Sequence, residues 1–159
     1  MSTQRVILIC GMAAVMACFP GAGGAQTLPA DRVPPAVRQS FETRFPGAQE
    51  VEWELESDKN YEAEFELNGA ETTARFDASG KWLETEAVVR RSRLPQPVNA
   101  AIVKAFPQYR ISGARSLAAW NSPDVIYEIH VENAREIVEV QFAADGRLLN
   151  RSAKSKPAK

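Results

Sequence analysis

The sequence predicts an α+β fold in which a unit of one helix and a four-stranded antiparallel meander sheet occurs twice in tandem, with the two sheets joined edge to edge. Two sets of repeated motifs predict the duplication, the first at a constant offset of 61 positions and the second at an offset of 66. A third observation predicts the elements within each copy, because helical spacing of apolar residues gives way to strict alternation. Since the offset grows between the two sets, we expect an inserted loop in the second copy, over Ala118–Asp124.

The repeated residues define the boundaries of the two copies. The helix motifs pair Val33-Pro34, Val37, Phe41 and Phe45-Pro46 with Leu94-Pro95, Val98, Ile102 and Phe106-Pro107. The strand and turn motifs pair Tyr61-Glu62, Phe76 and Ser79-Gly80 with Tyr127-Glu128, Phe142 and Asp145-Gly146. We therefore expect repeat 1 over residues 33–89, a basic linker over 90–93, repeat 2 over 94–152 and a basic disordered tail over 153–159.

An export segment is expected ahead of the first copy, over residues 1–25. A basic residue precedes an apolar run, Val6–Phe19, and the small residues of Gly21–Ala25 suit cleavage at the end of that stretch. The run is short for a membrane span, which needs about 20 apolar residues. Residues 15–18 resemble the lipobox of bacterial lipoproteins, so a lipid anchor at Cys18 is the alternative to soluble release. Both interpretations predict a periplasmic or secreted protein.

The first copy begins with a predicted helix over residues 34–45. Prolines suit its first turn, where the missing amide hydrogen has no helical acceptor to lose, and apolar residues spaced at i and i+4 continue until Pro46-Gly47. Glutamates then alternate with apolar residues over 50–56 and 61–67, which predicts two half-buried strands. Asn68-Gly69 is a tight-turn pair that precedes a third strand, and the turn over 77–80 precedes a fourth strand.

The second copy repeats this order of elements, but its apolar and polar residues alternate less regularly. Its helical stripe runs from Leu94 to Phe106, and alternation predicts strands over 125–131 and 138–142. A turn at Ala144-Asp145-Gly146 precedes the last strand. The stretch between the helix and these strands alternates poorly, and we place its strand over 113–119. Each sheet has one apolar face, which we expect to cover the helix of its own copy.

The order of these motifs resembles a known family. A helix, Phe45-Pro46, the strand with Trp53, the segment Tyr61–Phe65 and the segment Phe76–Leu83 are similar to the PepSY-like, beta-lactamase-inhibitor-like domain of secreted bacterial proteins. The second copy departs from the pattern where Leu148 replaces Trp82. The resemblance implies a helix on a four-stranded antiparallel sheet, an envelope location, and a role in binding or inhibiting proteins rather than in catalysis. It implies no catalytic residues.

Charge is distributed unevenly between the two copies. Residues 33–89 hold 13 acidic and 5 basic side chains, whereas residues 92–153 hold 6 acidic and 7 basic ones. Strand alternation places the glutamates of the first copy on one face, and we predict Glu52, Glu54, Glu62 and Glu64 as partner-binding residues. Three interpretations remain open for this face, namely a solvated surface that prevents aggregation, a docking surface for a basic protein segment, and a cation site.

Two tryptophans are further candidates for contact with a partner. Trp82 adjoins Leu83, so one of the two side chains must point away from the core, and Trp120 lies in the inserted loop. Exposed tryptophan is a frequent anchor in protein interfaces. The alternative is that each ring packs against its own copy.

The sequence argues against several classes of function. Both cysteines lie in the export segment, and no thiol pair, nucleophile elbow, metalloprotease motif or calcium loop occurs, so we expect no catalytic residue, no cofactor and no metal ligand set. The single histidine, His130, alternates with Glu128 and Glu132 on one strand face. The sequence argues against nucleic acid as a partner because no basic stripe crosses the copies, and no later segment could span a membrane.

These observations predict an exported, non-catalytic protein-binding module. Its partner would be an envelope protein or peptide, basic where it meets the glutamates, and the module would inhibit or modulate an envelope enzyme such as a peptidase. The alternative is a cation-binding envelope protein that uses the acidic sheet face of repeat 1.

Overall fold

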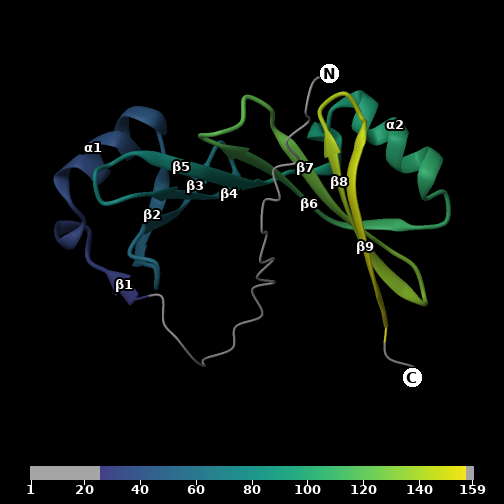
Figure 1. Cartoon of the computed structure of the whole chain (residues 1–159), viewed down its shortest axis with the longest axis horizontal. Coiled ribbons are helices and arrows are strands. Elements are labelled where there is room, and N and C mark those ends of the chain that lie inside the picture. Colours follow the sequence, from purple (N-terminus) through teal and green to yellow (C-terminus); the bar gives the residue numbers. More distant parts are fainter. Residues whose placement is uncertain (1–25, 157–159) are drawn as a thin grey trace, which may run out of the picture.

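The computed structural model describes residues 26–156, which form nine β-strands and two α-helices (Figure 1). The strands are β1 Gln26–Leu28, β2 Gln49–Leu55, β3 Tyr61–Leu67, β4 Ala70–Phe76, β5 Trp82–Val88, β6 Arg110–Ala119, β7 Ile126–Glu132, β8 Glu136–Ala143 and β9 Leu148–Ser155. The helices are α1 Pro35–Arg44 and α2 Gln96–Ala105, and the short 3-10 helices η1 Ala30–Arg32 and η2 Arg91–Arg93 precede them. The predicted signal segment and its lipidation alternative at Cys18 lie outside the described residues.

All nine strands belong to one antiparallel sheet in which spatial order follows chain order, from β1 to β9. The predicted fold class, a tandem repeat of α+β units each with its own four-stranded sheet, is therefore wrong. The described part of the chain is mainly β, and the two α-helices within it are attached to a single continuous sheet.

The pairing of β5 with β6 makes the sheet continuous. Five residue pairs join the two strands, from Glu84 opposite Ala119 to Val88 opposite Arg115. This ladder satisfies backbone amides and carbonyls that two separate sheets would leave unpaired at their edges. At the other end of the sheet β1 adds three residues against β2, with Leu28 opposite Trp53. Neither pairing depends on an alternating side-chain pattern, because the bonds involve the backbone alone.

Helix α1 packs on the first half of the sheet through an aromatic core. Phe41 lies within 5.0–6.3 Å, centroid to centroid, of four other aromatic rings. They come from the end of the helix and from β2, β3 and β4, and are Phe45, Trp53, Phe65 and Phe76. Edge-to-face arrangements dominate, as the quadrupoles of aromatic rings prefer. The i, i+4 stripe of α1 is thus buried against the alternating apolar residues of the strands.

Helix α2 packs on the second half through a mostly aliphatic core. Val98 and Ile102 of the helix are buried against Ile129, Val131 and Val140 of the central strands. β-branched residues are stiff and fit a pleated surface well, so this half needs fewer aromatic rings to fill its core. Figure 1 shows α1 at one end of the sheet and α2 at the other.

Both helices lie on the same face of the sheet. Cross-strand pairing places Thr72 beside Ala87 and Ala87 beside Ser116, and Ser116 shares a face with Ala114 of the α2 core. Because side chains alternate along a strand, the intervening residues point to the opposite face. Neither α1 nor α2 covers that opposite face, which we call the open face.

The end of the chain also differs from the prediction. Strand β9 continues through Ser155, so residues 153–155 pair with β8 rather than forming a disordered tail. The Nζ of Lys156 lies 2.7 Å from a carboxylate oxygen of Glu132. The predicted basic linker contains the short helix η2. Among residues 26–156 no helix has the length and apolarity that a membrane crossing requires.

Candidate functional site

The candidate site lies on the open face of the first half, where four glutamates face one another in two pairs. Glu52 of β2 is the direct cross-strand partner of Glu64 on β3, and Glu54 is the partner of Glu62. Alternation along the strands therefore places the four residues together, as the sequence predicted. Like charges directly opposite each other destabilise a strand pair by roughly 0.2–1 kcal/mol.

The crowding of these carboxylates changes their proton affinity. Burial raises the pKa of Glu62 to about 7, and the neighbouring charge of Glu56 adds to the rise while Arg75 opposes it. The pKa of Glu64 is also raised, first by burial and then by the charges of Glu54 and Glu52. Both effects disfavour the ionised form. A cation placed over this surface would oppose them.

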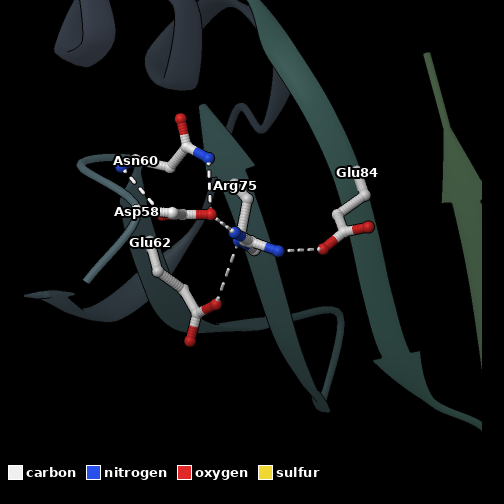
Figure 2. Close-up of polar contacts among 5 residues, drawn as sticks. All are labelled: Asp58, Asn60, Glu62, Arg75 and Glu84. Atoms are coloured by element: carbon white, nitrogen blue, oxygen red, sulfur yellow. Dashed lines mark hydrogen bonds and ion pairs between the residues drawn. The ribbon is translucent and has the colours of Figure 1, made fainter. Parts of the chain in front are cut away.

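Arg75 supplies the positive charge beside the glutamates and is held by three carboxylates, as Figure 2 shows. One guanidinium nitrogen lies 2.6 Å from Asp58, another donates a hydrogen bond of 2.7 Å to Glu84, and its Nε lies 3.8 Å from Glu62. Asn60 fixes Asp58 by donating its side-chain amide over 2.9 Å. Because Asp58 and Glu84 bind Arg75 more closely than Glu62 does, the cation leaves most of the four-glutamate surface uncompensated.

The raised pKa of Glu62 leads to a prediction about pH and stability. The folded-state pKa of about 7 lies above the ordinary value of 4.5, so the folded protein binds more protons than the unfolded chain between these values. The contribution of Glu62 to wild-type stability should therefore fall as pH rises through this window. Glu62→Gln removes this pH-dependent contribution. The free energy of unfolding of the variant minus that of the wild type should therefore increase by about 1–2 kcal/mol from pH 4 to pH 8, after allowance for solvent screening.

Urea denaturation at a series of pH values measures this difference. Glu42→Gln on the exposed surface of α1 removes the same charge away from the site and serves as the control. Its stability relative to the wild type should change little over the same range. If the difference in free energy of unfolding between Glu62→Gln and the wild type stayed constant with pH, the raised pKa of Glu62 in the folded protein would be contradicted.

The two candidate tryptophans do not join the glutamates. A register shift at Phe76 makes Trp82 its partner, so the indole packs beside the aromatic core on the helix side. The guanidinium of Arg44 lies 3.5 Å from the Trp82 ring centroid, and the indole nitrogen donates to Thr85 over 2.8 Å. Trp120 directly follows β6 and is 55% exposed, with the ammonium of Lys81 3.2 Å from its ring centroid.

In the second half, a cavity of about 530 Å³ opens between α2 and the end of the sheet, lined in part by Ala105, Leu148 and Arg151. The repeat offsets make these residues the counterparts of Arg44, Trp82 and Thr85. Ala105 and Leu148 are smaller than Arg44 and Trp82, and the cavity lies at the position that corresponds to those two side chains in the first half.

Within residues 26–156, two groups of side chains have potential metal-ligating atoms within 4.8 Å of one another. The first is Glu54, Glu56 and Glu62 on the acidic surface, and the second is Glu128, His130 and Glu139 on the open face of the second half. The sequence placed His130 between Glu128 and Glu132. In the structure Glu132 instead binds Arg110 and Lys156, and Glu139 of the neighbouring strand approaches the imidazole. Glu139 rather than Glu132 lies beside His130 because of the register between β7 and β8, which alternation along one strand does not reveal.

Residues 24–70 and 59–150 both match the family provisionally described as beta-lactamase-inhibitor-like and PepSY-like. The chain belongs to this family. The resemblance inferred from the motifs around Trp53, Tyr61 and Phe76 is thereby confirmed. No curated protein matches the chain.

Solved structures with the same fold come from Bacteroides species. A BLIP-like protein from Bacteroides fragilis shares 25% identity with a TM-score of 0.70, over 82% of this chain and 91% of that protein. A protein provisionally named as periplasmic from Bacteroides eggerthii shares 18% identity with a TM-score of 0.67, over 76% of this chain and 88% of that protein. The second similarity concerns the fold alone.

Proposed function

We propose that this member of the PepSY-like family is an exported, non-catalytic protein-binding module that docks a basic segment of an envelope protein on the acidic part of its open face. The family description as inhibitor-like supports a binding role rather than catalysis. The leader pattern of residues 1–25 and the periplasmic name of a structural neighbour support the location. On this proposal the partner is an envelope enzyme, such as a peptidase, that the module inhibits or modulates.

The observation that carries the proposal is the direct opposition of Glu52 to Glu64 and of Glu54 to Glu62. Such pairs reduce the stability of the free protein, and a cationic partner would relieve the repulsion on binding. Arg75 does not fill this role, because Asp58 and Glu84 hold its guanidinium at closer range. A lysine or arginine of the partner would meet several carboxylates at once, which favours rapid and specific association.

Trp120 is proposed as a separate contact for the partner, apart from the four glutamates. Its ring is more than half exposed and lies at the end of β6, the strand that pairs with β5 and so with the first half. The ammonium of Lys81 lies over one side of the ring. A rigid exposed indole can bury a large apolar area with little loss of conformational entropy. Trp82 is not included, since Arg44 and the core already enclose its ring.

Cation binding at Glu54, Glu56 and Glu62 is the alternative function, because their carboxylate oxygens lie within 4.8 Å of one another. Calcium takes six to eight oxygen ligands. Isothermal titration with calcium separates the two functions. Under the docking proposal calcium gives no specific heat, whereas a cation-binding protein would bind it and lose that binding in Glu54→Gln with Glu62→Gln.

The docking proposal predicts a charge-specific and site-specific loss of binding. Fluorescence anisotropy with a short synthetic peptide of alternating lysine and glycine provides the affinity, and capture from periplasmic extract provides the natural partner. Glu52→Gln with Glu64→Gln should weaken peptide binding by about 10-fold, equivalent to about 1.4 kcal/mol. The same double variant should release the captured protein.

A matched control separates the site from overall charge. Asp31→Asn with Glu42→Gln removes the same two charges from exposed positions on η1 and α1. This control should bind the peptide and retain the captured protein as the wild type does. Equal losses in the two double variants would indicate a nonspecific electrostatic effect and would overturn the docking site.

A further inference from the structure

The open face of the second half carries a cluster of one imidazole and two carboxylates. Glu128 and His130 are two positions apart on β7, so they share a face, and Glu139 of β8 is the direct cross-strand partner of His130. The Nε2 of His130 lies 3.8 Å from Glu128 and 3.6 Å from Glu139. Both separations are too long for a hydrogen bond, so the imidazole is not hydrogen-bonded to either carboxylate.

The surroundings hold these groups in place without neutralising them. Glu128 is buried, with 9% of its surface exposed, and Gln141 donates a hydrogen bond of 3.0 Å to its Oε2. Arg115 is the cross-strand partner of Glu128, but its guanidinium binds Glu86 on the other side. Among residues 26–156, neither Glu128 nor Glu139 forms an ion pair with a lysine or an arginine. A nearly buried carboxylate therefore faces the imidazole without a cation.

The spacing matches the requirements of a shared metal ion. Zinc binds imidazole nitrogen and carboxylate oxygen at about 2.0–2.2 Å in tetrahedral geometry, which puts neighbouring ligand atoms about 3.4 Å apart. The observed distances of 3.6 and 3.8 Å exceed this spacing by a few tenths of an ångström. Small rotations of side chains on a sheet surface would close the difference. Gln141 would act as the outer partner that orients the liganding carboxylate, as is usual around metal sites.

We propose that Glu128, His130 and Glu139 bind one zinc-class divalent metal ion on the open face of the second half. An imidazole ligand favours transition metals over calcium and magnesium, which prefer oxygen ligands alone. Three protein ligands leave a fourth position of the tetrahedron available to water or to a group on a docked molecule. This site is distinct from the acidic surface of the first half and does not depend on the docking function.

Isothermal titration of tag-free protein with zinc chloride tests the proposal. We expect one zinc ion per chain and no comparable binding of calcium. His130→Ala should abolish the binding, and Gln141→Ala should weaken it by about 10-fold, as expected for an outer partner. His130 is the only histidine of the chain, so its ring resonances in an NMR spectrum can be assigned without ambiguity and should shift on zinc addition.

Two further variants keep the result interpretable. Glu139→Gln changes a partly exposed side chain and should also lose zinc binding, which covers the case in which His130→Ala fails to fold. Glu54→Gln with Glu62→Gln alters the acidic surface and should bind zinc as the wild type does. Absence of zinc binding in the wild type, wild-type affinity in His130→Ala or Glu139→Gln, or loss of zinc in the acidic-surface variant would each overturn the proposal.

Discussion

Replacing Phe41 with alanine should lower the free energy of unfolding by about 3–5 kcal/mol, the range observed for large aromatic truncations in protein cores. The side chain is 6% exposed and lies among four aromatic rings, with centroid distances of 5.0 Å to Phe65 and 5.2 Å to Trp53. Truncation would leave a cavity beneath α1, because the surrounding rings come from the end of the helix and from three different strands and cannot all move inward. Urea denaturation monitored by circular dichroism measures the loss.

Val103→Ala on α2 is the control for this substitution. It also removes apolar atoms from a helix, but Val103 is 56% exposed, and the stability should change by no more than about 0.5 kcal/mol. If Phe41→Ala behaved like this control, the aromatic core beneath α1 would not be packed as described.

Gly80→Ala should destabilise the protein by about 3 kcal/mol, through backbone strain of about 1–2 kcal/mol and a further clash with the start of α1. Gly80 has a φ of +87°, a conformation that L-residues rarely adopt, and an added Cβ would lie 2.5 Å from the carbonyl oxygen of Ala36. The opposing atoms belong to the helix backbone, so relief requires movement of the whole helix terminus. Gly146 meets Pro97 in the same way, at 2.6 Å.

Gly69→Ala separates the two contributions. Gly69 also has a positive φ, of +74°, but no atom lies within 4 Å of an added Cβ. This substitution should destabilise the protein by only about 1 kcal/mol, from backbone strain alone. Thermal and urea unfolding of both variants provides the comparison. Equal losses at Gly80 and Gly69 would show that the turn does not rest against α1.

Individual strands were predictable where side chains alternate strongly. The glutamate and apolar residues of 61–67 predict the bounds of β3, because burial of one face and hydration of the other leave a clear period of two. Strand β6 begins at Arg110, earlier than its weak alternation indicated, since a register shift between Ile111 and Gly113 interrupts the pattern. The three residues of β1 carried no recognisable signal, because backbone pairing with β2 alone defines that strand.

The candidate site was predictable in part for the same reason. Alternation placed Glu52, Glu54, Glu62 and Glu64 on one face. The position of Trp82 was not predictable, since the register shift at Phe76 turns the indole toward the helix side. The approach of Glu139 to His130 depends on pairing between β7 and β8, and the three carboxylates around Arg75 come from separate segments of the chain.

The amino-acid sequence by itself determined the local features of this protein, namely its two predicted helices, its strongly alternating strands, the apolar stripe of each helix and the excess of acid in the first half. These features follow from the period of side chains along one segment. Only the tertiary structure decided that β5 pairs with β6 to make one nine-stranded sheet. It also decided which charges meet across strands. Edge pairing and register depend on backbone hydrogen bonds between distant segments, and any strand edge can offer those bonds regardless of its side-chain pattern.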